Sequence, residues 1–102
     1  MDWIEMLQLR AYAGKDREQA VMAFHQIFPA EQTAGADEVA LFVSPTIGTD
    51  LAIFIRWQKK PPPRGKSSLG LQLADTFSEF GQIYHTVWTR NSNPMVNQGE
   101  YR

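Results

Sequence analysis

The sequence contains no cysteine. This absence excludes disulfide bridges, thiolate metal sites and cysteine nucleophiles, and it fits a protein of the reducing cytoplasm. The chain has only two histidines, His25 and His85, which lie far apart in the sequence with no cluster of carboxylates beside them. Such a spacing is poor for metal binding. We therefore expect neither a bound metal nor another cofactor.

Long apolar runs are also lacking. No run approaches the roughly 18–20 residues that span a bilayer, and residues 1–5 lack the basic and apolar regions of a signal peptide. A net charge of −1 gives no general attraction for nucleic acid. We therefore expect a cytoplasmic protein with neither a membrane nor a nucleic acid as partner. Its 102 residues suit one domain, at 1–90, followed by a polar C-terminal tail at 91–102.

Half of the ten lysines and arginines are concentrated in one short stretch. They are Arg56, Lys59, Lys60, Arg64 and Lys66. The segment 57–68, WQKKPPPRGKSS, also holds three consecutive prolines, which predict a stiff, exposed connector. It is not a phosphate-binding loop, because Lys60 stands where that motif requires glycine. Two interpretations remain, a cationic lip that attracts an acidic ligand or a solvated loop.

Hydrophobic periodicity predicts six elements. Alternation with a period of two, or short apolar runs rich in β-branched and aromatic residues, predicts strands. Apolar stripes with a helical spacing predict helices. Strands are expected at 3–12, 39–44, 51–57 and 82–90, and helices at 16–28 and 68–80. This order is that of a ferredoxin-like βαββαβ fold of the α+β class, a four-stranded antiparallel sheet with two helices on one face.

Polar and small residues mark the expected helix ends. Asp16, with Gln19 three residues later, is expected to cap the first helix. Ser67 or Ser68 is expected to cap the second helix. Gly81 is expected to take the left-handed conformation that often ends a helix.

The predicted strands are apolar on both faces. In 51–57, Ile53 and Ile55 alternate with Phe54, and in 82–90, Val87 is followed by Trp88. Two helices can cover only one face of a sheet, and the other face would exceed the few hundred Å² of apolar patch that soluble monomers usually expose. We therefore predict a homodimer whose two sheets pack face to face, a dimeric α+β barrel.

These features, together with AYAGKDREQAVMAF at 11–24, resemble the dimeric α+β-barrel superfamily, in particular small proteins of the antibiotic-biosynthesis-monooxygenase type. The resemblance covers about residues 3–90. It implies a protein like the cofactor-free monooxygenases or isomerases that act on a small aromatic or polyketide-like molecule. Haem-degrading members use a first-strand asparagine and a second-helix histidine, which have no counterpart here. The alternative is a non-catalytic dimer that binds a small ligand or has a structural role.

The candidate catalytic residues are His85, Arg10 and Arg56. His85 could transfer a proton near neutral pH, or it could be a half-buried strand residue hydrogen-bonded to a neighbour. We expect the first and third strands to be parallel neighbours, which would bring Arg10 near Arg56. The two guanidinium groups could then bind a carboxylate or a phenolate. Alternatively, they pair with Glu5, Glu38 or solvent.

The candidate ligand-binding residues are Gln8, Tyr12, Trp57, Tyr84 and Trp88. Gln8 and Tyr12 share a face of the first strand with Arg10, and the other three offer flat apolar area for a small aromatic or acidic ligand. These aromatic side chains could instead pack in the core of the dimer. A closed cavity that holds His85 and an arginine would favour catalysis. A cavity filled by side chains, or His85 buried against a backbone acceptor, would favour the binding or structural alternative.

Overall fold

The computed structural model describes residues 2–62 and 65–91, and it confirms the predicted order of elements. The strands are β1 (Trp3–Ala11), β2 (Glu38–Val43), β3 (Asp50–Trp57) and β4 (Gly81–Thr89). The helices are α1 (Gly14–Ile27) and α2 (Ser68–Phe77), each followed by a short 3-10 turn, at Pro29–Glu31 and Ser78–Phe80. Apart from Asn91, the predicted polar tail lies outside the described residues.

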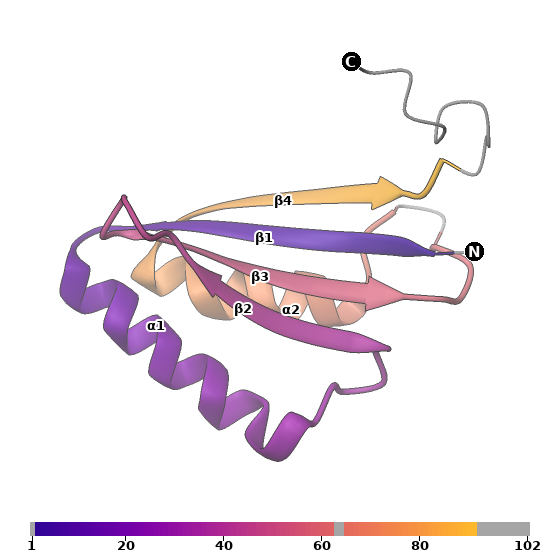
Figure 1. The fold of residues 1–102 in the computed structure, drawn as a ribbon, viewed down its shortest axis with the longest axis horizontal. Helices are drawn as coiled ribbons and strands as arrows, with labels where there is room; N and C mark the ends of the chain where they lie inside the picture. The colour runs from indigo at the N-terminus through magenta and orange to yellow at the C-terminus, as the bar shows by residue number, and fades with distance from the viewer. Residues whose placement is uncertain (1, 63–64, 92–102) are drawn as a thin grey trace.

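The four strands form one antiparallel sheet in the order β2-β3-β1-β4, with both helices on one face (Figure 1). The expectation that the first and third strands are parallel is therefore wrong. The β2–β3 hairpin reverses the chain, so the strand that lies next to β1 is the antiparallel β3, while β2 runs parallel to β1 beyond it. In this register Arg10 lies opposite Asp50 and Ile4 lies opposite Arg56. Arg10 and Arg56 consequently sit at opposite ends of the sheet.

The core lies between the sheet and the two helices. Every second residue of β1 and of β3 is buried there, which is the period that a strand with one covered face should show. Its members include Trp3, Leu7, Leu9, Ala20, Phe24, Ile53, Ile55, Leu73 and Phe77. Each large apolar side chain buried in this way contributes about 1.5–3 kcal/mol to stability, so this layer holds the fold together.

The helix ends follow the sequence only in part. Ser67 caps α2, because its hydroxyl oxygen accepts a hydrogen bond from the backbone N–H of Gly70. Asp16 is not a cap: α1 begins at Gly14 after Ala13, which provides no side-chain hydrogen bond, and Asp16 lies in the first turn, where its charge still suits the helix dipole. Gly81 is extended rather than left-handed. Glycine is needed there because a Cβ atom would overlap the backbone carbonyl of Arg10.

The second face of the sheet has no helix over it (Figure 1). It carries the side chains that alternate with the core residues, so its composition follows from the period of the strands. Three aromatic residues on this open face are more than half exposed, Phe42 at 58%, Tyr84 at 64% and Trp88 at 58%. The open face is therefore apolar surface in contact with solvent in the single chain.

Candidate functional site

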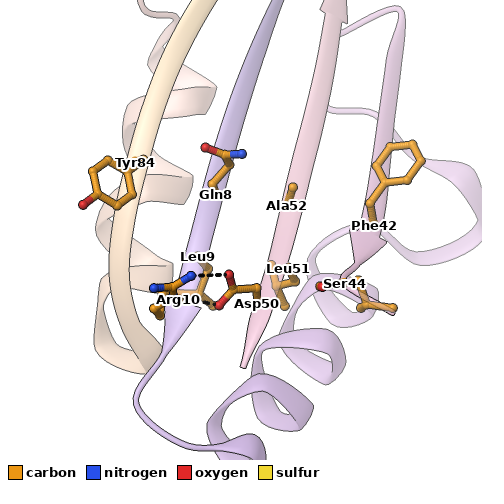
Figure 2. A pocket seen from close by; sticks show the side chains of 10 residues that line it. Gln8, Leu9, Arg10, Phe42, Ser44, Asp50, Leu51, Ala52 and Tyr84 are labelled. Atoms are coloured by element: carbon orange, nitrogen blue, oxygen red, sulfur yellow. Dashed lines mark hydrogen bonds and ion pairs between the residues drawn. The ribbon is translucent and has the colours of Figure 1, made fainter. Parts of the chain in front are cut away.

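A pocket of about 450 Å³ lies on the open face, toward the end of the sheet where β1 leads into α1. All four strands supply side chains to it, as Figure 2 shows: Gln8 from β1, Phe42 from β2, Ala52 from β3 and Tyr84 from β4. The rings of Phe42 and Tyr84 stand at its two sides, with the small Ala52 side chain leaving room between them. We call this the sheet-face pocket. Its volume lies within the range of small-molecule sites, and its lining combines aromatic rings with a few polar groups.

An ion pair forms the polar end of the sheet-face pocket. Arg10 Nε and Nη2 donate hydrogen bonds to the two carboxylate oxygens of Asp50 at 3.1 and 2.9 Å, since the β1–β3 register places these residues opposite each other. The side-chain hydrogen bond with Arg10 lowers the pKa of Asp50, and the same hydrogen bond raises the pKa of Arg10. Both groups therefore remain charged across the neutral pH range.

The turn that carries Asp50 is fastened to α1. Arg17 Nη1 donates to the backbone carbonyls of Ser44, Ile47 and Asp50 at 3.2–3.3 Å. Ser44 Oγ accepts a hydrogen bond from the backbone N–H of Ile47 at 2.9 Å, which closes the turn on itself. The carboxylate of Asp50 also accepts from the Thr49 hydroxyl at 3.1 Å. This rim of the pocket is therefore preformed by hydrogen bonds.

A second pocket, of about 310 Å³, lies at the opposite end of the open face. Arg56 and Trp88 line it, so these two predicted site residues come together, but away from Arg10. Arg56 Nε donates to a carboxylate oxygen of Glu38 at 3.2 Å. The alternative interpretation, in which Arg56 pairs with Glu38, is confirmed.

A buried polar cluster lies on the other, helix-covered face of the sheet. Its centre is Glu5, whose carboxylate is fully buried. Oε2 accepts hydrogen bonds from Trp57 Nε1 at 2.8 Å and from the Ser67 hydroxyl at 2.5 Å. Oε1 accepts from the Ser67 backbone N–H at 3.1 Å and lies 2.8 Å from His85 Nε2. We call these four residues the Glu5 cluster.

The surroundings explain how a carboxylate can be buried there. Three donors and the His85 Nε2 atom surround its oxygens, and such satisfaction by hydrogen bonds is the condition under which burying a charge is tolerated. An ionised carboxylate only accepts hydrogen bonds, so His85 Nε2 would be the donor in the tautomer that matches an ionised Glu5. Gly70, in the first turn of α2, makes room for the pair, since a Cβ atom at this position would overlap the Glu5 carboxylate.

The structure thus divides the predicted site residues between two faces. Gln8, Arg10 and Tyr84 share the sheet-face pocket, whereas His85 and Trp57 belong to the Glu5 cluster on the covered face. Neither of the two pockets described holds both His85 and an arginine, the arrangement that would have favoured catalysis. Tyr12 lies just beyond β1, is 71% exposed and lines neither of them.

Sequence reasoning missed Glu5 as a site residue. The signal was present, because Glu5 alternates with Trp3 and Leu7 on a face of β1 that is otherwise apolar. A lone carboxylate in such a row indicates a buried polar group with partners, but the sequence does not say which distant residues supply them.

The basic connector lies partly outside the described residues, since Pro63 and Arg64 are not among them. Lys59 Nζ lies 4.6 Å from the centre of the Trp57 ring, a cation–π arrangement at the start of the connector. A role for these cations in attracting an acidic ligand stays a prediction. Among the described helices, none has the length and apolar character needed to cross a bilayer.

No protein-family model and no curated protein matches the chain. Solved structures do match. A Bacteroides thetaiotaomicron protein of unknown function, described as a candidate oxidoreductase, has a TM-score of 0.63 at 16% identity, covering 85% of this chain and 95% of its own. SnoaB, a cofactor-independent oxygenase from Streptomyces nogalater, has a TM-score of 0.57 at 13% identity, covering 91% of this chain and 97% of its own.

A third match is a candidate antibiotic biosynthesis monooxygenase from Bordetella bronchiseptica, with a TM-score of 0.50 at 16% identity, covering 83% of this chain and 94% of its own. At such low identity these likenesses establish the fold and leave the reaction open. The chain shares its ferredoxin-like α+β fold with these solved structures, in agreement with the fold that the sequence predicted.

Proposed function

We propose that the protein acts as a homodimer that binds a small aromatic molecule between its two sheets. The observation that carries this proposal is the open face, where Phe42 and Tyr84 stand more than half exposed at the sides of the sheet-face pocket and Trp88 is similarly exposed at the second pocket. A second copy of the same sheet is the simplest cover for such a surface.

Covering the open face would change the character of the sheet-face pocket. In the single chain the pocket opens to solvent above Gln8 and Ala52, whereas a facing sheet would close it over. A closed, largely apolar site with a few polar groups is the usual form of a small-molecule site. Dimerisation and ligand binding are thus expected to support each other, because the ligand fills space that the two sheets enclose.

Two measurements test the proposal. Sedimentation velocity at micromolar concentration should give the mass of two chains, and a monomer there would contradict the dimer. Native mass spectrometry of the freshly purified protein should then show a retained small molecule, or should show uptake of added aromatic phenols. A dimer that takes up none of them would leave only the structural role that the sequence also allows.

A second candidate function is cofactor-free oxygenation, the chemistry named for SnoaB, or the isomerisation that the sequence resemblance also implies. The observation that favours it is the Glu5–His85 pair, since a buried carboxylate that orients an imidazole is a common device for proton transfer. In the tautomer in which Nε2 donates to Glu5, Nδ1 would be the nitrogen able to take up a proton. A substrate would have to reach it from the covered side of the sheet.

Oxygen uptake provides the test for this second function. A panel of electron-rich phenols would be incubated with the protein in metal-free buffer, and dissolved oxygen would be followed with an electrode. His85→Asn should abolish any uptake, whereas His25→Asn, on the exposed side of α1, should leave it unchanged. Oxygen uptake that persists in the His85→Asn variant would show that His85 is not needed for the reaction.

A further inference from the structure

We propose that Asp50 determines the charge of the ligand that the sheet-face pocket accepts. By occupying the guanidinium group of Arg10, Asp50 makes the pocket selective for a neutral ring with a hydroxyl or amide group over a carboxylate. This inference rests on the proposed ligand-binding function and specifies the chemical class of the ligand. It also reverses the interpretation of Arg10 as the group that binds an oxyanion.

The first step is the charge of the pocket lining. Its charged members are one cation and one anion, Arg10 and Asp50. They bind each other through two hydrogen bonds, of 3.1 and 2.9 Å, which occupy the Nε–Nη2 edge of the guanidinium, one of the edges that can bind a carboxylate through two hydrogen bonds. A ligand anion would have to displace Asp50 or lie beside it, and like charges at such a distance repel.

The second step is that Asp50 cannot easily move aside. Its backbone carbonyl accepts hydrogen bonds from Arg17 Nη1 at 3.3 Å and from the Ser44 N–H at 3.0 Å. Its side chain accepts from the Thr49 hydroxyl at 3.1 Å as well as from Arg10. The carboxylate is therefore held at the pocket as a fixed negative charge.

The third step is what remains for a ligand to bind. Gln8 offers an amide and Tyr84 a hydroxyl group, both of which donate and accept hydrogen bonds without a change of charge. Phe42 and Tyr84 offer ring surface at the sides (Figure 2). A neutral phenol or aromatic amide can use all of these groups while the ion pair stays intact.

The test compares two probes with the same ring system, 2-naphthol and 2-naphthoate, which are neutral and anionic at pH 7. Affinities would be measured by isothermal titration calorimetry on the full chain in its native oligomeric state. The unmodified protein should bind 2-naphthol about tenfold more tightly, a difference of about 1.4 kcal/mol. In Asp50→Asn, 2-naphthoate should gain about tenfold and become salt-sensitive, while 2-naphthol changes little.

The matched control is Glu38→Gln, which releases Arg56 at the far end of the same face. It should leave the preference between the probes unchanged. Asp50→Ser provides a second variant that removes the charge, so that the outcome does not depend on one substitution folding well.

The outcomes separate the two proposals. An unchanged preference in both Asp50 variants, or a preference of the unmodified protein for 2-naphthoate, would overturn the role of Asp50 while leaving the binding site in place. If neither probe binds the unmodified protein, both the ligand site and the role of Asp50 are wrong.

Discussion

Glu5 Oε1 and His85 Nε2 lie 2.8 Å apart inside the protein, on the neighbouring strands β1 and β4, which are far apart in the sequence. Glu5 faces the helices from β1, and His85 stands opposite Leu7, one inward position along β1 from Glu5. The pair therefore joins β1 to β4 by side chains, in addition to the backbone ladder, and through Ser67 it also joins the start of α2.

Replacing Glu5 by glutamine should destabilise the protein by about 1–3 kcal/mol, as expected when buried hydrogen-bond donors lose their acceptor. The amide would present N–H groups to donors that now meet a carboxylate. Urea unfolding followed by circular dichroism provides the measurement. Glu18→Gln on the exposed face of α1 should stay within about 0.5 kcal/mol, and an equally small effect of Glu5→Gln would contradict the role assigned to the cluster.

Replacing Gly70 by alanine should also destabilise the fold, by about 1–3 kcal/mol. Alanine normally stabilises a helix by about 1 kcal/mol relative to glycine. A loss of stability would therefore point to the close contact with the Glu5 cluster. The loss is expected because the new methyl group would displace the Glu5 carboxylate and the His85 ring. Gly14→Ala, in open space at the start of α1, is the matched control and should be neutral or stabilising in the same unfolding experiment.

Phe42→Asp should convert the proposed dimer into a monomer at micromolar concentration. A charge placed on the open face would be buried without a partner when the two sheets meet. Met22→Asp provides the control, since Met22 is similarly exposed, at 62%, but lies on α1. Sedimentation velocity of both variants measures whether each is a monomer or a dimer. If Phe42→Asp stays a dimer, the open face is not the dimer interface.

The Arg10–Asp50 pair predicts a specific response to acid. The pKa of Asp50 is lower in the folded chain than its ordinary value of 3.8, so the unfolded chain binds the proton first as the pH falls. The stabilisation by the pair is therefore present above 3.8 and is lost as the pH falls through the folded value. Unfolding of the unmodified protein and of Asp50→Asn at pH 7, 5, 4 and 3 should show a gap in stability that closes at the acidic end. A gap that stays constant would contradict the assignment.

Much of the fold follows from local patterns. The six elements appear where the periodicity places them, with ends shifted by at most three residues, and Ser67, one of the two expected caps, caps α2. The predicted direction of β3 relative to β1 was wrong because strand direction depends on how the whole chain folds back on itself. No single stretch of sequence determines this. That one error placed Arg10 beside Arg56 instead of beside Asp50.

The candidate site shows the same limit. Alternation along β1 correctly puts Gln8 and Arg10 on one face. Alternation along β4 likewise puts His85 on the face that holds Ile83 and Val87. Only the packed structure shows that this face is the one covered by helices. The partners of Glu5 come from β3, β4 and the segment before α2. Such long-range contacts produce no recognisable spacing of residues in the sequence.

The Glu5 cluster has a consequence for the proline-rich connector between β3 and α2. Trp57 and Ser67, which lie at the two ends of the connector, both bind the same carboxylate, so the two ends of this loop are held together at one point. Doubling the length of a loop so closed costs only about 0.6 kcal/mol in entropy. The connector is thus the place where the chain should tolerate an inserted peptide or a fluorescent label while the sheet, both helices and the sheet-face pocket keep their arrangement.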